Sequence, residues 1–581
     1  MTNHQDYNLT PSKNGPMLRW YGKKSLDSAK PYPASLQELY HCEGSVDKQP
    51  TFSSFQNDKC NLLLHGDNIE VLSTLRANGF MGKIDLIYID PPFDSKATYT
   101  KSVALRGDRK LFSKDDKGEG LSLDEQVQYS DMWQADSYLQ FMYERLILLR
   151  ELLSDQGSIY LHCDHHKSHH LRCLMDEVFG GDNFVNEIIW CYKSGGAGSG
   201  GFARKHDTIL YYSKNSTPMF FPQQQKSYMK PWSGKNPAQT YYEDREGTYT
   251  LVNVKDWWDD IGMLSTDAHE RLGYPTQKPE ALLERVIKAS SNPNSIVLDC
   301  FAGSGTTAAV AQKLGRRWIA CDINKGAIQT TAKRLNGIIE SQKQQLIHDV
   351  EPASYKMAHY KINNYDLQQQ HNEFKDYVLG HYNITRDKKD TYFDGLMGER
   401  LVKLIPFNRI ATLQDLSMLQ EELRIRTKEA RAIAMISYGT EYRLREGVVD
   451  HNKRNPLNRI DLIDIKLEDG LIEHTPAEME VIIENETLTI RQYASPTVLQ
   501  RLKKSAGDIE AIKLDNHLCQ IDCVLIDLDY DDETFRPTLI DTPEKKTELV
   551  KGSYSVGNTG STIAIKVVDV LGEEVFKVIK R

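Results

Sequence analysis

The sequence predicts an α/β protein whose core is a mostly parallel, doubly wound sheet, interrupted by an insertion and followed by an α+β domain. Three observations support this prediction. Near-continuous apolar runs alternate with segments of helical periodicity, as parallel strands and their crossover helices require. Two of the predicted strands end in turn-forming motifs rich in proline or glycine. Between residues 193 and 273 the regular alternation stops.

Length and composition indicate a multidomain protein. The 581 residues leave room for about three or four domains. The chain has no long apolar run, and its amino terminus lacks a basic region followed by an apolar one, so we expect neither a membrane span nor a secretory signal. Nine scattered cysteines favour reduced thiols, and we expect a cytoplasmic protein. Because the net charge is -9, any DNA binding needs local basic surface.

The first α/β unit spans residues 60–93. CNLLLHGDNIEVLSTL and then KIDLIYIDPPF predict a strand, a turn, a helix, a second strand and a loop. The second strand, residues 84–89, is apolar almost throughout and stops because two prolines cannot continue a central strand. The tetrapeptide at its carboxyl end, where open α/β sheets bind ligands, is Asp90-Pro91-Pro92-Phe93. An ordinary turn after a strand is the alternative interpretation.

Further strands and helices follow on both sides of the insertion. Before it, residues 138–153 and 168–179 have helical periodicity, and GSIYLHCD between them predicts a buried strand. After it, TQKPEALLERVIKAS predicts a helix, SIVLDC a strand, FAGSGTT a glycine turn, AAVAQKLG a helix and RRWIACDI a strand. Strand, glycine turn and helix in succession form a nucleotide-type binding unit.

The glycine turn, residues 301–307, predicts an anionic nucleoside-like ligand. Its glycines permit a tight turn and a close approach of the backbone, and the helix that follows directs free N–H groups at an anion. Asp322 ends the next strand, where a carboxylate can accept both hydroxyls of a ribose. The turn matches neither a complete G-x-G-x-x-G fingerprint nor a phosphate loop, which argues against a dehydrogenase or an NTPase.

Together these motifs resemble the β class of S-adenosylmethionine-dependent DNA amino-methyltransferases, in which the catalytic motif precedes the glycine motif. The resemblance covers residues 60–335 and rests on HGD, IDPPF, GSIYLHCD, YPTQKP and LDCFAGSGTT. Cys300 stands where the family often has proline, a departure that leaves the glycine turn intact. The resemblance implies a Rossmann-like methyltransferase fold with permuted motif order, S-adenosylmethionine as the cofactor and double-stranded DNA as the substrate.

The same resemblance implies that Asp90, Pro91, Pro92 and Phe93 are catalytic. An exocyclic base amine is a poor nucleophile because its lone pair is delocalised into the ring. Hydrogen bonds to the Asp90 carboxylate and the Pro91 carbonyl would make the amine more tetrahedral and aim its lone pair at the methyl group. Phe93 would stack on a base flipped out of the duplex. Aspartate at the first position favours N6 of adenine. Cytosine N4 is the alternative, as is a DNA-recognition subunit without turnover.

Other residues would contact the cofactor. Asp67 is expected at its adenine, Asp322 at its ribose and Lys278 at its carboxylate. A helix N-cap for Asp67 and a solvated lysine for Lys278 are the alternatives. The full set of expected cofactor contacts is Asp67, Asp90, Lys278, Asp299, Phe301, Ala302, Gly303, Ser304, Gly305, Thr306, Thr307 and Asp322.

Two further regions carry expectations about ligands. Histidines between residues 162 and 170 recur at i and i+4, a spacing that can bind zinc, but they coincide with a predicted strand and helix, so we predict no metal site. The insertion is the predicted target-recognition region, because its glycines, tyrosines, Arg204 and Lys205 suit a surface that contacts phosphates and base edges. A structural excursion without function is the alternative.

The carboxyl-terminal region is rich in predicted strands and shows no catalytic constellation. Its ending, VVDVLGEEVFKVI, is similar to the tails of type III restriction-modification Mod subunits, which implies a homodimer, DNA clamping or docking of a restriction or helicase subunit. The predicted order is an amino-terminal extension (1–57), a catalytic half (58–192), the insertion (193–273), a cofactor half (274–335), a helical linker (336–375) and the α+β domain (376–581).

Overall fold

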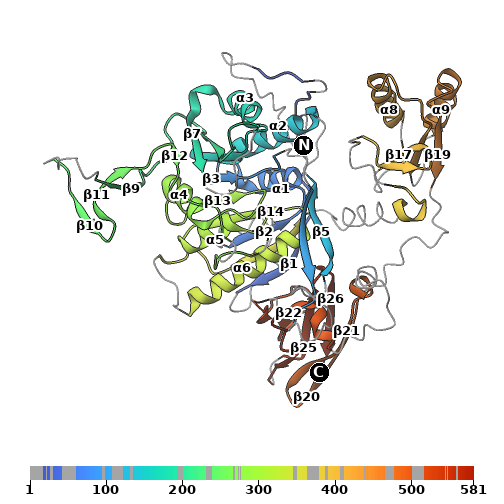
Figure 1. Cartoon of the computed structure of the whole chain (residues 1–581). Coiled ribbons are helices and arrows are strands. Elements are labelled where there is room, and N and C mark those ends of the chain that lie inside the picture. The colour runs from blue at the N-terminus through green and yellow to red at the C-terminus, as the bar shows by residue number, and fades with distance from the viewer. Residues whose placement is uncertain are drawn as a thin grey trace, which may run out of the picture. The chain divides into compact units, whose positions relative to one another are not determined.

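The computed structural model is shown in Figure 1 and forms two compact units, residues 1–363 with 476–581, and residues 364–475. The residues it describes are 17–20, 23–26, 31–41, 60–93, 98–107, 122–130, 135–192, 200–229, 238–265, 268–272, 274, 276–344, 350–362, 378–385, 390, 392–405, 411, 413–437, 440, 442–464, 477–499, 516–543, 545, 547–557 and 560–580.

A ten-stranded sheet forms the centre of the first unit, in the order β1-β15-β2-β14-β13-β3-β6-β8-β7-β12. The neighbours from β15 to β6 are parallel, whereas β1 and β8 run antiparallel to the strands beside them. The predicted mostly parallel α/β fold is therefore confirmed. The strands are β1 Ala34–Tyr40, β2 Asn61–His65, β3 Ile84–Ile89, β6 Leu153–Cys163, β7 Phe184–Cys191, β8 His206–Ser213, β12 Trp257–Trp258, β13 Ile296–Asp299, β14 Arg317–Asp322 and β15 Met357–Ile362.

Helices cover both faces of this sheet. In β3, Ile87 and Ile89 pack into a core shared with helices α1 to α3, whereas Leu86 and Tyr88 pack into a core shared with α4 to α6. A strand buried on both faces needs the continuous apolar run that the sequence shows. The helices are α1 Asn68–Leu75, α2 Ala135–Leu152, α3 Ser168–Phe179, α4 Glu280–Ser290, α5 Thr306–Lys313 and α6 Lys325–Lys343, with short turns η2 Arg76–Phe80 and η4 Gly181–Asn183.

The strand order reverses between β13 and β3. From β13 the chain passes through α5 to β14 on one side, and from β3 it passes through α2 to β6 on the other. Leu298 pairs with Ile87 in the parallel register, so the loops after these two strands begin side by side and then diverge. In open α/β sheets such a switch point is where ligands bind.

The expected insertion begins later than residue 193. His206–Ser213 is a strand of the central sheet between β6 and β7, because its side chains from residue 208 onward are buried. A separate three-stranded sheet then projects from the unit, in the order β10-β11-β9, seen at the left of Figure 1. Its strands are β9 Gln224–Tyr228, β10 Tyr242–Asp244 and β11 Gly247–Asn253.

The expected helical linker, residues 336–375, also differs from the structure. Helix α6 ends at Lys343, and Met357–Ile362 forms strand β15, which joins β1 to the rest of the central sheet. Its two ends and alternate positions are buried, as a strand inside a sheet requires. Residues 363–377 lie outside the described part of the chain.

The carboxyl-terminal region, expected as one domain, is divided. Its first part is the second unit, whose described residues include a four-stranded sheet and the helices α8 and α9: β16 Gly395–Met397, β17 Arg400–Leu404, α8 Leu413–Ile425, β18 Ile433–Ser437, α9 Tyr442–Arg454 and β19 Ile460–Asp464. Its last part belongs to the first unit, because Leu525, Phe535 and Ala564 pack into the core of the central sheet. This part contains β20 Glu478–Glu484, β21 Thr487–Ala494, η6 His517–Gln520, β22 Ile521–Asp527, β23 Leu539–Asp541, β24 Ser553–Ser555, β25 Thr562–Asp569 and β26 Glu574–Lys580.

A two-stranded ribbon of β4 Thr98–Ala104 and β5 Ser122–Ser130 completes the described strands. Among the helices in the described ranges, none combines the length and the low polarity that crossing a membrane requires.

A buried charge cluster joins the carboxyl-terminal sheet to β1 and β15. Lys566 of β25 forms ion pairs with Glu38 of β1 and, at 2.5 Å, with Glu574 of β26, and His359 of β15 contacts the same Glu38 carboxylate. Burial by itself would raise the pKa of Glu38, but the positive charge of Lys566 and the contact with His359 outweigh it and hold the pKa well below 4.5. Glu574 behaves in the same way, with its pKa lowered to about 2.

We expect Lys566→Met to lower the free energy of unfolding at pH 7 by about 3–5 kcal/mol, because Glu38 is then buried without its cation. A carboxyl whose pKa is depressed in the folded state stabilises the fold above its ordinary pKa of 4.5 and loses that contribution as the pH falls. The difference between wild type and variant should therefore narrow below that pH. Urea denaturation at several pH values measures both effects. Lys580→Met is the matched control, since Lys580 is exposed and lies 3.7 Å from Asp532. An equal loss of unfolding free energy in Lys566→Met and Lys580→Met would contradict a stabilising role of the Lys566–Glu38 pair.

Candidate active site

Asp90 follows β3 directly and is held on one oxygen only. Its Oδ2 forms an ion pair with the ammonium group of Lys278, which the loop before α4 supplies. The Lys278 Nζ also lies 5.3 Å from the centre of the Phe93 ring. The other oxygen, Oδ1, is buried and has no hydrogen-bond partner within the described part of the chain. A buried acceptor without a donor costs free energy, so this oxygen is suited to a donor that arrives with a ligand.

The rest of the tetrapeptide places an aromatic ring beside this carboxylate. Pro91 is buried, and Pro92 and Phe93 are half-buried. The Phe93 ring stacks on His162 of β6, with 6.0 Å between centroids and 28° between planes. Phe93 is partly exposed, and a ring supported by a stacked neighbour can receive a second aromatic system on its exposed part.

The glycine turn lies across the switch point from Asp90. Gly303 and Gly305 have φ of 52° and 71°, a left-handed region that favours glycine. The Gly303 N–H donates to Oδ2 of Asp322 at 2.8 Å, and the Asn324 N–H donates to Oδ1 of the same carboxylate at 2.8 Å. Asp322, at the end of β14, therefore links the glycine turn after β13 to the neighbouring strand.

Asp299, the last residue of β13, also holds the glycine turn through hydrogen bonds. Its carboxylate accepts hydrogen bonds from the Phe301 N–H at 2.9 Å and from the Thr307 hydroxyl at 2.5 Å. Burial raises the pKa of Asp299 to about 7, and the negative charges of Asp90 and Asp322 add to this rise. Three carboxylates thus lie close enough to influence one another, and a positively charged ligand group between them would be stabilised.

Helix α6 holds the remaining residues of the turn. Arg334 donates to the Ser304 carbonyl at 3.2 Å and to the Thr306 hydroxyl at 3.0 Å, and the Ser304 and Thr306 hydroxyls lie 3.2 Å apart. The Ala302 N–H donates to the Cys321 carbonyl at 3.0 Å. Hydrogen bonds within the protein therefore hold the backbone of the glycine turn in place.

Asp67 has the N-cap role that was its alternative interpretation. Its carboxylate accepts a hydrogen bond from the Ile69 N–H at 2.9 Å and an ion pair from Arg145 of α2 at 2.8 Å. Because His65 pairs with Asp322 in the register of β2 and β14, Asp67 also lies at the carboxyl edge that carries the glycine turn. A contact of Asp67 with the cofactor stays a prediction.

Arg204 and Lys205 precede β8 at the same edge of the sheet. Since β8 runs antiparallel to β6, with Thr208 opposite Cys163, its amino end lies beside the carboxyl end of β6. The Arg204 guanidinium is exposed and donates to Nε2 of His165 at 2.8 Å. The Lys205 carbonyl accepts a hydrogen bond from the Tyr192 N–H.

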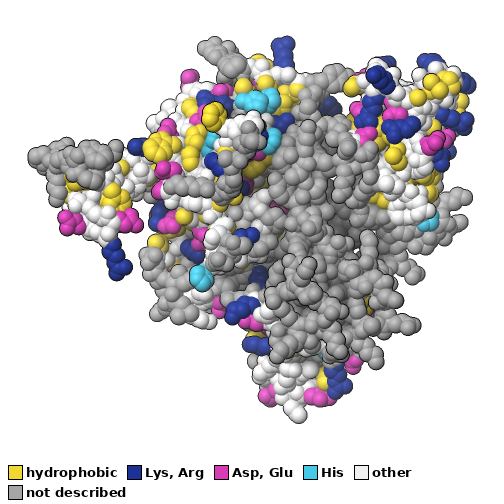
Figure 2. All heavy atoms as spheres, in the orientation of Figure 1, with side chains coloured by type: hydrophobic (Ala, Val, Ile, Leu, Met, Phe, Trp, Pro, Cys, Tyr) yellow, Lys and Arg dark blue, Asp and Glu magenta, His cyan; other side chains and the backbone are white. Residues whose placement is uncertain are grey.

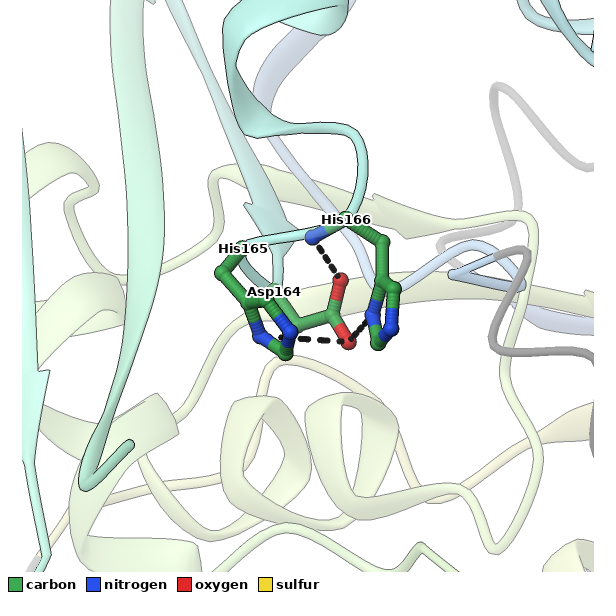
Figure 3. A group of neighbouring side chains, drawn as sticks. All are labelled: Asp164, His165 and His166. Atoms are coloured by element: carbon green, nitrogen blue, oxygen red, sulfur yellow. Dashed lines mark hydrogen bonds and ion pairs between the residues drawn. The ribbon is translucent and has the colours of Figure 1, made fainter. Parts of the chain in front are cut away.

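Asp164, His165 and His166 form a compact group after β6 (Figure 3). Their ligand-type atoms lie within 4.8 Å of one another. Asp164 accepts a hydrogen bond from the backbone N–H of His166 at 2.8 Å and contacts Nδ1 of that ring at 2.6 Å, which orders the turn that leads into α3. The Arg204 cation already lies against His165, and it opposes a metal cation there. The absence of a metal site stays a prediction.

Comparison with known proteins identifies the family. A sequence model described as DNA methylase matches residues 84–333, which include Asp90, the glycine turn and Asp322. The type II methyltransferase M.HinfI of Haemophilus influenzae is 30% identical over 285 residues, which cover 48% of this chain and 70% of that enzyme. The chain belongs to the DNA methylase family.

Other relatives of this methylase are more distant or are matched over a smaller share. The DNA adenine methyltransferase YhdJ of Escherichia coli is 28% identical, over 48% of this chain and 84% of its own. The type III restriction-modification enzyme StyLTI Mod subunit of Salmonella typhimurium is 27% identical, over 48% of this chain and 54% of its own. The solved M1.HpyAVI-SAM complex is 20% identical, over 47% of this chain and 98% of its own, with a TM-score of 0.30.

The cofactor of this DNA methylase is S-adenosylmethionine, and the residues present fit it. When bound, S-adenosylmethionine supplies a methyl group on a positively charged sulfonium, which the carboxylates of Asp90, Asp299 and Asp322 favour electrostatically. The positive-φ turn at Gly303 and Gly305 allows close approach of the backbone. Which of these groups contacts which part of the cofactor stays a prediction.

Sequence reasoning missed two contacts of the methylase site. Lys278 was expected at the cofactor carboxylate, and in the structure it forms an ion pair with Asp90. Arg145 was not singled out, although it is buried and pairs with Asp67. An arginine at the apolar face of a predicted helix is a signal that could have pointed to a buried partner.

We expect Gly305→Val to weaken S-adenosylmethionine binding by about tenfold or more, because φ is positive there and a Cβ would lie 2.6 Å from Thr331. Calorimetry measures the affinity, and thermal unfolding shows whether the variant is folded. Gly337→Ala in α6 is the control, since a Cβ there meets no atom within 4 Å, and its affinity should be unchanged. A folded Gly305→Val protein that binds with wild-type affinity would refute the role of the turn.

Proposed function

We propose that this DNA methylase transfers the methyl group to N6 of a flipped-out adenine at a specific site in double-stranded DNA. The observation that carries the proposal is the state of the Asp90 carboxylate. Lys278 holds one oxygen, and the other is buried and without a partner beside the Phe93 ring. That oxygen can accept a hydrogen bond from the N–H of a base amine when the base stacks on Phe93.

The chemistry follows from this arrangement. The target amine donates one hydrogen bond to Oδ1 of Asp90 and a second to the Pro91 carbonyl, which makes the nitrogen more tetrahedral and nucleophilic. Bound S-adenosylmethionine would supply the methyl group to this nitrogen, and its sulfur would keep the electron pair of the C–S bond. The methylated nitrogen would then be positively charged and would lose one proton, which the Asp90 carboxylate can accept through Oδ1. Lys278 pairs with the other oxygen of this carboxylate and so holds it in place.

Adenine is favoured over cytosine by two considerations. The tetrapeptide begins with aspartate, the residue that favours adenine in the resembled family. The relative YhdJ is named a DNA adenine methyltransferase. Methylation of cytosine N4 by the same amine chemistry is the second candidate. A recognition subunit without turnover is disfavoured because Asp90 through Phe93 are all present.

The DNA-contacting surface is proposed to surround the carboxyl edge of the sheet. Arg204 and Lys205 lie at this edge, and Figure 2 shows histidine side chains on the surface over α3, which begins there. The projecting sheet carries exposed aromatic side chains, Tyr228 and Tyr242, which suit contacts with sugars and base edges. We propose that target recognition lies within residues 193–273, outside the buried strand β8 of the central sheet.

We further propose that the protein acts as a homodimer and with a restriction or helicase subunit. The relative StyLTI is named a Mod subunit of a type III restriction-modification enzyme, and the ending VVDVLGEEVFKVI is similar to the tails of such subunits. This ending covers the end of β25 and most of β26, and β26 is an edge strand of a four-stranded sheet with exposed side chains at alternate positions.

We expect Asp90→Ala to reduce methyl transfer by on the order of 10³-fold while S-adenosylmethionine affinity stays within about twofold. Removal of the carboxylate deletes the acceptor for the amine and frees Lys278 without changing the glycine turn. Transfer of labelled methyl groups to DNA measures the rate, and calorimetry measures the affinity. Asp182→Ala is the control, because Asp182 is exposed in the short turn η4.

The modified base is identified by mass spectrometry of nucleosides from DNA treated with wild type or Asp90→Ala. N6-methyladenine that depends on Asp90 is the expected product. N4-methylcytosine as the product would instead support the second candidate, methylation of cytosine N4. Near-normal turnover by Asp90→Ala would overturn the mechanism.

We expect Arg204→Ala with Lys205→Ala to weaken DNA binding and to leave cofactor binding unchanged. If both contact phosphates, affinity falls on specific and scrambled duplexes alike, and its dependence on salt becomes shallower because fewer counterions are released. If one contacts a guanine edge, discrimination at one position is lost instead. Titrations at low and high salt distinguish these results. Lys83→Ala is the control, since Lys83 is exposed at the amino end of β3, the opposite edge of the sheet. Unchanged DNA binding would move recognition to another part of the chain.

A further inference from the structure

We propose that His162 and Asp207 are positioning residues for methyl transfer, which fix the orientation of Phe93 and so the place of the flipped-out base. The inference rests on the proposed function, because it concerns the base that Phe93 stacks on. It depends on a hydrogen-bonded chain beside the catalytic tetrapeptide, made of two buried side chains, Tyr88 and His162, and two half-buried ones, Asp207 and Tyr192.

The chain of hydrogen bonds starts two residues before Asp90. The Tyr88 hydroxyl lies 2.8 Å from Nδ1 of His162, and Nε2 of His162 lies 3.2 Å from Oδ2 of Asp207. The Tyr192 hydroxyl donates to the other oxygen of Asp207 at 3.1 Å. These side chains come from β3, β6, β8 and the residue after β7. Both ring nitrogens of His162 and both oxygens of Asp207 therefore have partners.

These hydrogen bonds fit the His162 tautomer that carries its proton on Nε2, because the Asp207 carboxylate can only accept. Burial, together with the Asp90 carboxylate, raises the pKa of Tyr88 well above its ordinary value of 10, so its hydroxyl keeps the proton and donates to Nδ1. Nε2 then carries the ring proton and donates to Asp207. Burial alone would raise the pKa of Asp207, but the hydrogen bond from His162, the positive charge of Lys278 and the Tyr192 hydroxyl outweigh it. Asp207 thus stays ionised as an acceptor.

The His162 ring has no freedom to turn. It is fully buried, it contacts the edge of Trp190 at 5.6 Å between centroids, and it stacks beneath Phe93 at 6.0 Å. A rotation of the imidazole would break both of its hydrogen bonds and leave buried polar atoms without partners. The ring is therefore a rigid base for Phe93, and a flipped-out base would form the third layer of the stack.

A purely structural network would not need this composition. Apolar side chains of similar volume fill a core with less desolvation than a histidine and an aspartate do. The polar chain lies instead at the one place in the described sheet where it supports the catalytic loop, since Tyr88 and Phe93 flank Asp90 and Pro91 in sequence. Rigid support beneath a reacting group is what near-attack geometry requires, because small misplacements reduce transfer rates strongly.

The test compares Asp207→Asn and Tyr88→Phe with two matched controls. Tyr160→Phe removes a buried hydroxyl of β6 that bonds to Ser290 at 2.7 Å, and Asp176→Asn changes a carboxylate that accepts from Tyr212 at 2.6 Å. The duplex carries the site mapped by modified-base sequencing. Three quantities are measured: S-adenosylmethionine affinity, the single-turnover methylation rate, and the fluorescence of 2-aminopurine placed at the target base, which rises when the base leaves the stack.

We expect Asp207→Asn and Tyr88→Phe to slow single-turnover methylation by about tenfold and to reduce the fluorescence rise, with cofactor affinity within about twofold. The double variant should lose less than the product of the two single losses, because both act through His162. The controls should match wild type in all three quantities. Equal rates in test and control variants, or a loss of cofactor affinity in parallel with the rate, would overturn the proposal.

Failure of the proposed function has a different signature. Wild-type protein that methylates cytosine would overturn the adenine assignment, while the ratio of variant to wild-type rates on that base still tests His162 and Asp207. Wild-type protein that extrudes the base without transferring a methyl group would refute the activity, and the fluorescence of the variants would still decide their positioning role.

Discussion

The parallel pairing of β13 with β3 is the constraint on which the site depends. The two strands are far apart in the sequence, yet Leu298 lies opposite Ile87, so their carboxyl ends open at the same point of the sheet. The chain leaves β13 toward one face and β3 toward the other, and the two loops diverge around a crevice. A one-residue change in this register would reverse the side chains of β3 between its two cores and displace Asp90 from the glycine turn.

The carboxylates at this crevice have two roles. Two of them bond to the backbone of the glycine turn, and the third has an oxygen left for the reacting amine. Asp299 and Asp322 use their oxygens on backbone N–H groups and a hydroxyl, and they order the glycine turn. Asp90 is different because Lys278 occupies one oxygen and leaves the other for an incoming donor. Lys278 pairs with Asp90, and the further carboxylates Asp299 and Asp322 lie near it, so the site favours the positively charged sulfonium of the methyl donor.

The first unit extends beyond the methyltransferase sheet, because the last strands of the chain pack on it. Glu38 and Lys566 are buried and pair with the half-buried Glu574 between β1, β25 and β26, and apolar residues of this part such as Phe535 pack into the core of the central sheet. Buried charges of opposite sign hold a register that apolar contacts alone leave less specific. In this chain the pairing attaches the carboxyl-terminal sheet to the sheet edge formed by β1 and β15.

The sequence by itself determined the α/β class, the order of the motifs and the edge of the sheet where they lie, because apolar periodicity, proline and glycine act over a few residues. It also indicated the family, which the comparisons show. The tertiary structure alone decided that Lys278 pairs with Asp90, that Arg145 pairs with Asp67 and that β8, β15 and the last strands join the first unit. Such contacts join residues separated by long stretches of chain. A pattern over a few residues does not specify which distant strand or charged residue will be the partner.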